Sequence, residues 1–574
     1  MKATLIATWV FALTCWLLSC KNLEPSETTT PSETTSSTKK SISNTLKENE
    51  QLPIADRVAL YLRLKKEQPN AYNFENEDEL TMYGYGLLWA DQPEEALGIF
   101  QLIATQFPES ANAYDSLGEA YLVLGQKERA LEHYRQSLAM NPDNFNAEDA
   151  IERILHPEIK PLTPEERFSQ VFTVDDYRSD LQQLGEKLLE VHPNALKFTS
   201  EAAFWNTLES LQQQVSPQTT YAEFTWMCSK MIAQLGCSHT SNGNFFPQWE
   251  MLPLAQVFPL EARWMDGKLY VTDASVHSET ISKRDVITTI NGQPVTELIE
   301  SIYAHIPAQA HVRTYKTHQL NDWLMGLLPY ALGLPKEFTV TTDKHPTPIL
   351  LKPLEKGPEW QPFPFRRKCQ DNLCLELREE EKTAILTIAS FNYYPWNNLD
   401  AFEAFVDESF ARLQEAQIEN LILDVRFNGG GSAESSIHLL KYLLKAPFSY
   451  FTQNEETYTP FENRFRGNLY TLIDGRGNST TGHFMAKIKE AERGVIIGEE
   501  LGSNKLCTAG QSVLRLKHTK MVYYVANTAS EVWAPSLPDD RGIVPDHEVV
   551  QSVADYFNQT DTVMEFALAL PTKK

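Results

Sequence analysis

The sequence is poor in basic residues: its 574 residues include 51 Lys and Arg against 76 Asp and Glu, a formal net charge of −25. So acidic a protein repels the phosphate backbone of nucleic acids, and no nucleic-acid partner is expected. Cysteine and histidine show no spacing typical of a zinc site, and we predict no metal and no cofactor. Apolar residues are plentiful, with 42% hydrophobic and 11% aromatic. The length predicts roughly three or four domains.

A targeting pattern lies at residues 1–20. Lys2 precedes the apolar run Leu5–Leu18, which is too short and too early for a good membrane-spanning helix, so we predict a signal peptide. The following Ser19-Cys20 completes a stretch that resembles the bacterial lipoprotein cleavage box. This resemblance implies that Cys20 is lipidated and that the lipid anchors the protein in a membrane of the bacterial cell envelope. The periplasmic and outer faces both stay open, and an ordinary signal peptide with an unmodified Cys20 is the alternative.

Residues 21–50 are predicted to be a disordered tether. The stretch from Glu24 to Asn44 is rich in Ser, Thr and Pro and has almost no large apolar side chain. Such a segment cannot bury enough surface to fold, so it is expected to link the lipid to the first domain.

The next segment, 51–157, contains an internal repeat. Seven positions recur at a shift of about 34 residues, a period that resembles tetratricopeptide repeats, in which small residues let two helices pack closely. The resemblance implies a helical domain whose groove binds a protein partner; a spacer packed on the next domain is an equal alternative. The matched positions are Leu80, Tyr83, Gly84, Leu87, Ala96, Phe100 and Pro108 with Tyr114, Leu117, Gly118, Tyr121, Ala130, Tyr134 and Pro142.

Five cysteines follow Cys20. In an oxidising compartment, Cys369 and Cys374 are close enough in sequence to join the strands of a hairpin, and Cys228 with Cys237 forms a possible second bridge. One cysteine is left over under this pairing.

The region between 168 and 345 has two patterns. Residues 168–250 carry amphipathic helical periods that end at LGCSHT, where Gly236 breaks the last helix just before Ser238 and His239. Residues 251–345 are predicted to form a second module. Segments between 252 and 305 alternate like strands, and INGQPV after one strand resembles the carboxylate-binding PDZ modules of some proteases. The GLGF-type loop of that fold is not evident, so we describe the module as PDZ-like.

Residues 346–555 are predicted to form an α/β core. Its pattern is strong from Thr383 to about Val550 and is organised around LILDVRFNGGGS, at 421–432. A short apolar run there predicts a buried strand, three glycines predict a tight loop, and Ser432 precedes a helical pattern. The N–H groups of such a loop suit a phosphate or a developing oxyanion. The lysine and hydroxyl residue of a P-loop are absent, which disfavours nucleotide. Residues 556–574 are predicted to be a C-terminal tail.

Ser479 and His239 are the candidates for nucleophilic chemistry. Ser479 lies in GNSTTG at a predicted strand-to-helix turn, similar to the exposed nucleophile of other serine hydrolases but without their GxSxG motif. By position alone, a helix N-cap is the commoner role for such a serine. A serine needs a base to attack a carbonyl, and His239 is the best placed of 13 histidines because it follows a helix end in a polar cluster.

Four motifs in one order resemble the C-terminal-processing (tail-specific) serine peptidases. They are LILDVRFNGGGS, a serine at a helix start, GVIIGE and GIVPD, and the resemblance covers roughly 168–550. It implies a crotonase-like ββα core, a polypeptide substrate, and Ser479 as nucleophile. The whole chain is then a multidomain α+β protein, with helical repeats, a helical subdomain, a PDZ-like β-rich module and an α/β peptidase core.

The resemblance also implies the other site residues. The branch similar to the tricorn core protease uses a histidine preceded by serine, which here is His239 after Ser238, with an acid near the C-terminal motif that falls on Asp539, or on its neighbour Asp540. The tail-specific branch uses a lysine, and that register falls on Asn504 beside Lys505, the alternative base. Oxyanion donors are implied at Gly429 or Gly430 and at Thr480. Asp in place of the usual Glu leaves a catalytically weak or inactive peptide-binding pseudopeptidase as the second functional hypothesis.

Overall fold

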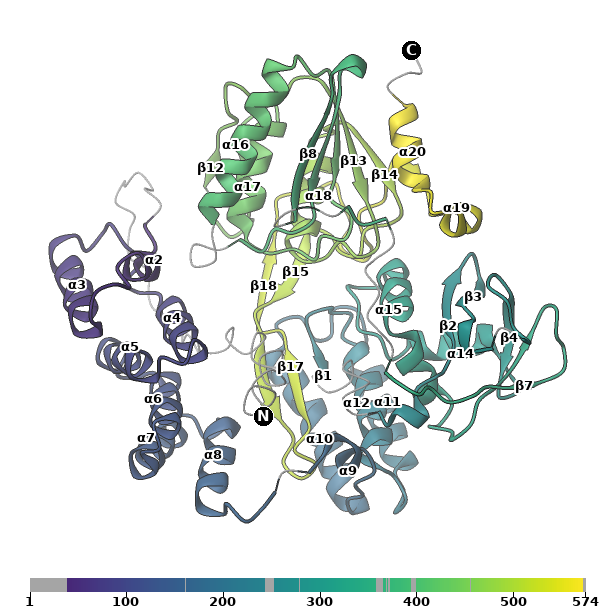
Figure 1. The fold of residues 1–574 in the computed structure, drawn as a ribbon, viewed down its shortest axis with the longest axis horizontal. Helices are drawn as coiled ribbons and strands as arrows, with labels where there is room; N and C mark the ends of the chain where they lie inside the picture. The colour runs from purple at the N-terminus through teal and green to yellow at the C-terminus, as the bar shows by residue number, and fades with distance from the viewer. Residues whose placement is uncertain are drawn as a thin grey trace. The chain divides into compact units, whose positions relative to one another are not determined.

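The structure is a computed structural model that describes residues 39–160, 162–242, 252–277, 279–357, 365–367, 369, 372–393, 399–454 and 456–570 (Figure 1). The chain divides into two compact units, one made mainly of residues up to 161 and a larger one made of nearly all the rest. No helix among these described residues is long and apolar enough to cross a membrane. The signal peptide, Cys20 and most of the predicted tether lie outside the described residues.

The first unit consists of helices that pack in antiparallel pairs. The repeat glycines explain the pairing: a Cβ on Gly84 would lie 2.5 Å from the Phe100 ring, and one on Gly118 would lie 2.8 Å from the Tyr134 ring. Only glycine therefore lets each aromatic ring pack on the preceding helix, which is the close packing that the repeat pattern predicts. The helices are α2 (Ile42–Lys47), α3 (Ile54–Glu67), α4 (Glu77–Trp89), α5 (Pro93–Gln106), α6 (Ala111–Val123), α7 (Lys127–Met140) and α8 (Phe145–Leu155).

The predicted tether extends too far. Residues 42–47 form α2, in which Ile42 and Leu46 are fully buried in the core of this unit. Ser41 caps the helix by accepting a hydrogen bond from the N–H of Asn44. The segment is rich in Ser, Thr and Lys, so the sequence prediction gave no weight to Ile42 and Leu46, which are spaced four residues apart as on one helix face. These two side chains pack the segment onto the repeats.

The second unit begins with helices α9 (Pro164–Phe168), α10 (Val174–Val191), α11 (Glu201–Gln214) and α12 (Tyr221–Ala233). Helix α12 starts with a capping box at Thr220 and ends before Gly236, whose φ of +63° suits glycine. The chain then turns through 237–240 into β1 (Ser241–Asn242), which pairs antiparallel with β17 (Val522–Val525). The predicted helix break at Gly236 is confirmed.

A small antiparallel sheet with two helices follows, in the region predicted to be PDZ-like. Helix α14 packs on the sheet, and Asn321 of α15 bonds the main chain of Trp264 on edge strand β2, accepting from its N–H at 2.7 Å and donating to its C=O at 3.0 Å. The elements are β2 (Glu261–Met265), β3 (Lys268–Asp273), β4 (Val286–Ile290), β5 (Gln293–Pro294), α14 (Val295–Tyr303), α15 (Arg313–Ala331), β6 (Thr339–Thr342) and β7 (Ile349–Leu350).

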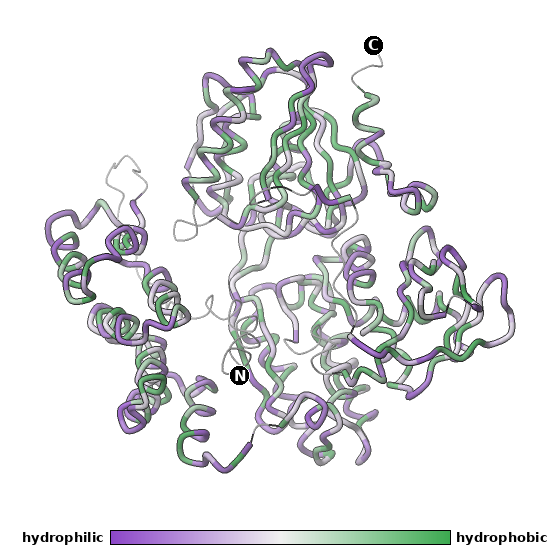
Figure 2. Tube along the Cα trace, in the orientation of Figure 1, coloured by the Kyte–Doolittle hydropathy of each residue, from purple (hydrophilic) through white to green (hydrophobic). Residues whose placement is uncertain are grey.

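The predicted α/β core is a six-stranded sheet in the order β19-β14-β13-β10-β9-β8, parallel except for β8. Its central strands are buried on both faces, as the continuous apolar runs predict. Figure 2 shows these hydrophobic strands between helices with mixed surfaces. The strands are β8 (Leu373–Arg378), β9 (Thr383–Ile388), β10 (Asn420–Asp424), β13 (Asn468–Ile473), β14 (Val495–Gly498) and β19 (His547–Glu548).

Helices cover both faces of this sheet. On one face lie α16 (Leu399–Glu415), α17 (Ala433–Leu443) and α18 (Thr480–Glu490), which contribute to the main apolar core. The other face is covered by α20 (Thr562–Ala569), with Val563, Met564 and Ala567 packed on the strands. The remaining elements are β11 (Phe448–Ser449), β12 (Thr457–Tyr458), β15 (Leu506–Ala509), β16 (Ser512–Arg515), β18 (Thr528–Glu531) and α19 (Val553–Asn558).

Two predictions need correction here. The C-terminal tail is not a separate appendage, because α20 completes the second face of the sheet, and Arg426 at the end of β10 donates to Asp561 at the helix N-cap at 2.8 Å. Cys369 and Cys374 form the predicted disulfide. The possible bridge between Cys228 and Cys237 is wrong, because both are buried free thiols.

Candidate active site

Ser479 lies at the turn between β13 and α18, as the strand-to-helix pattern predicts. Its backbone has φ +55° and ψ −126°, a conformation that non-glycine residues rarely adopt. The serines at the N-caps of α2, α6 and α11 accept a hydrogen bond from their own helix, whereas the Ser479 side chain makes no such bond. The commoner role of an N-cap is therefore wrong for this serine, and its hydroxyl remains available for chemistry.

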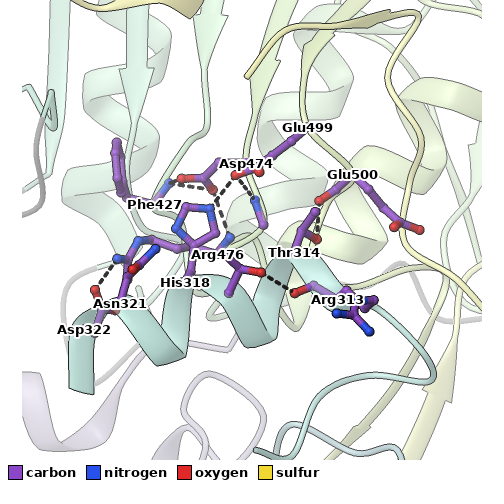
Figure 3. A network of polar contacts seen from close by, with 12 residues as sticks. Arg313, Thr314, His318, Asn321, Asp322, Phe427, Asp474, Arg476, Glu499 and Glu500 are labelled. Carbon is purple, nitrogen blue, oxygen red and sulfur yellow. Dashed lines mark hydrogen bonds and ion pairs between the residues drawn. The ribbon is translucent and has the colours of Figure 1, made fainter. Parts of the chain in front are cut away.

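Backbone and side-chain bonds hold the loop that leads to Ser479. The Asp474 carboxylate accepts the N–H of Phe427 at 3.1 Å, which joins this loop to the end of β10. Arg476 forms a two-pronged ion pair with Asp322 of α15, as Figure 3 shows. Of the five residues between β13 and Ser479, the first and the third are thus anchored by their side chains.

Glu499 forms a second attachment between the loop and α15. It pairs with His318 of α15 and accepts the N–H of Gly475 at 3.2 Å (Figure 3). Burial alone would raise the pKa of Glu499, but His318 and these hydrogen bonds hold the pKa below its ordinary value. Burial raises the pKa of neighbouring Asp474. The loop that leads to Ser479 is therefore held by helix α15 as well as by its own sheet.

The glycine loop after β10 lies directly against Ser479. Gly430 has φ +102°, and a Cβ built there would be 2.7 Å from Ser479 Cβ and 3.0 Å from the Thr480 nitrogen. Asn428 holds the loop, since its side chain accepts from the Gly430 N–H and donates to the Ile388 carbonyl, each at 2.9 Å. The glycine is required because two backbone segments approach each other here.

Two backbone N–H groups near Ser479 lack an acceptor among the described residues: those of Gly429 and Thr480. Thr480 is the first residue of α18, where N–H groups have no partner within the helix and the helix dipole favours negative charge. Of the two glycines predicted as oxyanion donors, Gly430 is wrong, because the Asn428 side chain already accepts its N–H. Gly429, which is exposed, and Thr480 keep that capacity.

His239 lies in the loop after α12, and burial lowers its pKa to about 4. The side chain of Ser238 is 3.4 Å from His239 Nδ1 and donates to Asn478 Oδ1 at 2.9 Å. Asn478 directly precedes the nucleophile, so this bond brings the predicted base and nucleophile together. Within the described residues, no direct hydrogen bond joins His239 to Ser479.

Asp539 does not lie in this relay. Its carboxylate pairs with Lys197 at 2.7 Å and is 39% exposed, and no hydrogen bond from it reaches Ser238 or His239 among the described residues. Asp539 and Lys197 line an open cavity of about 460 Å³, and Asp540, the predicted substitute for Asp539, lines it as well. The assignment of Asp539 as a direct partner of the Ser238–His239 pair is therefore wrong in this structure, because Lys197 satisfies it.

Lys505, the alternative base, is also engaged elsewhere. Its Nζ pairs with Glu531 at 3.2 Å across the β15–β18 ladder. Asn504 is fully buried and structural, donating to the carbonyls of Asp539 and Arg541 at 2.8 Å. Neither side chain bonds to Ser479.

Sequence reasoning missed two neighbours of the nucleophile. Cys507 Sγ lies 3.6 Å from Ser479 Oγ, and burial raises the pKa of this thiol to about 12, so it stays protonated. Asn478 links Ser238 to the loop. The only sequence signal for Asn478 was its position next to Ser479. No sequence signal pointed to Cys507, which lies 28 residues further along the chain.

The geometry is that of a serine hydrolase: an uncapped serine at a strained turn, donors for an oxyanion, and a neighbouring histidine. Residues 382–549 match the profile of peptidase family S41, and residues 111–144 match that of a tetratricopeptide repeat. The protein is a serine-type peptidase that acts on polypeptide, and the similarity to family S41 lies in its core, at residues 382–549. No curated protein sequence matches the chain significantly.

Several solved structures are similar to the chain. A protein from Parabacteroides merdae described as a peptidase shares 14% identity and a TM-score of 0.39, covering 69% of this chain and 96% of its own. Mature CPAF complexed with lactacystin shares 13% identity and a TM-score of 0.48, covering 69% and 98%. The photosystem II D1 C-terminal processing protease shares 14% identity and a TM-score of 0.34, covering 69% and 98%.

Proposed function

We propose that the protein is an envelope-anchored endopeptidase that hydrolyses polypeptides through a Ser479 acyl-enzyme, with His239 as general base. The observation that carries this proposal is the state of Ser479, strained at φ +55°, uncapped, and in contact with the glycine loop. Strain of this kind persists only where the surrounding structure imposes it, and here two loops do.

The catalytic steps follow from the positions of the donors. Neutral His239 accepts the proton of Ser479 Oγ, the oxygen attacks the peptide carbonyl, and the N–H groups of Gly429 and Thr480 stabilise the negative charge. His239 then gives its proton to the leaving amine, and water hydrolyses the ester by the same route. Each oxyanion donor contributes about 2.7–4 kcal/mol in comparable sites.

The choice of His239 over Lys505 rests on their partners. Lys505 is held by Glu531, whose side chain is 38% exposed, and its amine makes no hydrogen bond to Ser479 among the described residues. His239 is kept neutral by burial and is connected through Ser238 to the residue before the nucleophile. Catalytic hydrogen bonds are often loose before substrate binds, so the missing direct bond to Ser479 is compatible with this role.

The remaining parts of the proposal concern location and recruitment. The lipoprotein-like box at Cys20 supports a lipid anchor in the cell envelope, with the membrane face open. The repeat helices, whose close packing depends on Gly84 and Gly118, support a second role in binding a protein partner.

Labelling with a fluorophosphonate probe tests the nucleophile and the base. We expect the wild type to be labelled and Ser479→Ala to lose all label, while Ser110→Ala, which removes an ordinary N-cap serine of α6, keeps it. His239→Ala is expected to reduce the labelling rate by about 100-fold or more, as loss of a general base does, and Lys505→Ala to change it little. Equal labelling of Ser479→Ala would refute the nucleophile.

The second candidate is a peptide-binding pseudopeptidase. The observation in its favour is that the described residues place no carboxylate in hydrogen-bond contact with Ser238 or His239. This reading predicts peptide binding by the wild type without any labelling of Ser479.

A further inference from the structure

We propose that Asn478 is a positioning residue that selects the tautomer of His239 through Ser238. The proposal deepens the proposed function and depends on it, since it concerns how the predicted base is prepared for Ser479. Asn478 takes the place in the relay that the sequence assigns to Asp539.

The contacts form a short chain of three side chains. Ser238 Oγ donates its single proton to Asn478 Oδ1 at 2.9 Å and also lies 3.4 Å from His239 Nδ1. A hydroxyl has one proton and two lone pairs. Because that proton is directed to Asn478, Ser238 can only accept from His239, so Nδ1 carries the imidazole proton. Nε2 is then unprotonated, which is the state that a general base requires.

The backbone of Asn478 fixes the direction of this acceptor. Its N–H donates to the carbonyl of Asn428 in the glycine loop at 3.3 Å, and its carbonyl accepts the N–H of Thr481 in α18 at 3.0 Å. One residue therefore bonds to the loop of the oxyanion donors, to the helix of the nucleophile and to the loop of the base. A shift of any one of them alters the alignment of the other two.

An amide selects the tautomer without adding charge. Two ionisable side chains interact electrostatically with His239: His192 at the end of α10 and His483 on α18. Burial lowers the pKa of both to about 4. The carboxylate of Asp539 is paired with Lys197. The imidazolium that forms during catalysis is therefore held by a neutral relay, in contrast to a triad in which an aspartate stabilises it.

Substitution of Asn478 tests the relay against a merely structural role. We expect Asn478→Ala to lower kcat/KM for a peptide substrate by about 10- to 100-fold, mainly through kcat, because Ser238 can then donate to Nδ1 and stabilise the wrong tautomer. Asn478→Asp keeps an acceptor and adds a negative charge. It should retain most activity and raise the apparent pKa of the acidic limb of kcat/KM by about one unit or more.

Two further measurements keep the proposal falsifiable. Ser238→Ala combined with Asn478→Ala should cost little more than either alone, since both break one relay. In the wild type, nitrogen NMR of His239, identified by its loss in His239→Gln, should show a protonated Nδ1 and a bare Nε2. This last measurement needs no Asn478 variant to fold.

The outcomes separate the two proposals. An unshifted acidic limb in Asn478→Asp, full activity in Asn478→Ala, or an Nε2-protonated His239 would each overturn the relay while leaving Ser479 as nucleophile. Failure of the wild type to label at Ser479 would instead overturn the proposed function.

Discussion

At the residue scale, the site depends on positions where one atom decides the geometry. Gly430 is the clearest case, because its φ of +102° is unsuited to a side chain and its missing Cβ leaves room for Ser479 and Thr480. Gly430 does not itself stabilise an oxyanion, because its N–H already donates to the Asn428 side chain. Its contribution is therefore to keep the glycine loop close to Ser479 and Thr480, the proposed nucleophile and one proposed oxyanion donor.

Substituting Gly430 with alanine should disable the site without unfolding the core. The new Cβ would lie 2.7 Å from Ser479 Cβ and 2.8 Å from the Asn478 carbonyl oxygen, so the loop must move away from the nucleophile. Strain of this type costs about 1–3 kcal/mol, and we expect the rate of probe labelling to fall by at least about 10-fold. The control is Gly357→Ala, where nothing lies within 4 Å of the added Cβ. Unchanged labelling of Gly430→Ala would contradict the proposed arrangement.

Several histidines with a lowered pKa should make stability depend on pH, among them His305, whose pKa burial lowers to about 3. Burial lowers the pKa of His192, His239 and His483 to about 4, against an ordinary value near 6.5. Between these values the unfolded chain binds more protons than the folded protein, so this contribution is fully present above about pH 6.5 and is lost as the pH falls toward 4.

Urea unfolding at a series of pH values would measure this effect. We expect the free energy of unfolding to decrease from pH 7 to pH 5, and His483→Gln to make the decrease shallower. His156→Gln, a change at an exposed histidine, serves as the control. If the free energy of unfolding instead increased from pH 7 to pH 5, the predicted direction of the pH dependence would be wrong.

At the element scale, helix α15 is the unexpected part of the site. It lies in the region predicted to be PDZ-like, yet Asp322 and His318 on one of its faces hold the loop that leads to Ser479 through Arg476 and Glu499 (Figure 3). Thr314 on the same helix donates to the Glu500 carbonyl at 2.7 Å. The geometry at Ser479 is therefore set partly by an element that contributes no catalytic group.

Asp322→Ala should impair Ser479 from a distance. The change removes the ion-pair partner of the Arg476 guanidinium, which is only 8% exposed, and breaking a buried pair costs about 3–5 kcal/mol. We expect a lower free energy of unfolding together with slower probe labelling. Glu300→Ala, which breaks the exposed pair with Arg313, should cost at most about 1 kcal/mol. Equal effects of the two variants would show that the Arg476–Asp322 pair has no special role.

The elements themselves were largely predictable from sequence, while their cross-connections were not. Period, apolar runs and glycines located the strand β10, the glycine loop and the helix start at Ser479, because these depend on neighbours within one segment. The Asn478–Ser238 hydrogen bond joins positions 240 residues apart, and the contact of Cys507 with Ser479 joins positions 28 residues apart. A supporting acid at Asp539 was inferred from motif order, which carries no information about Lys197.

At the scale of the whole molecule, the chain combines an acidic, multidomain peptidase with a short array of repeats. The repeat helices have their own apolar core, built around residues such as Phe100 and Tyr134, and the peptidase has another between its sheet and α16–α18. Two separate cores indicate that each unit is stabilised mainly by its own contacts. Recruitment and catalysis can therefore be separated experimentally.

Deleting residues 21–161 from a soluble form should leave the chemistry intact. Because the core of the second unit lies within the rest of the chain, we expect the truncated protein to fold, to label at Ser479 at a rate within about twofold of the full-length form, and to cleave short peptides equally well. If the repeats recruit a partner or substrate, cleavage of full-length polypeptides in an envelope extract should fall, and a full-length Gly118→Leu variant, which disrupts the contact with Tyr134, should reproduce the fall. A truncated protein that no longer labels would instead assign the repeats a role in folding the site. Equal cleavage of every polypeptide would leave them as a spacer between the proposed lipid anchor and the enzyme.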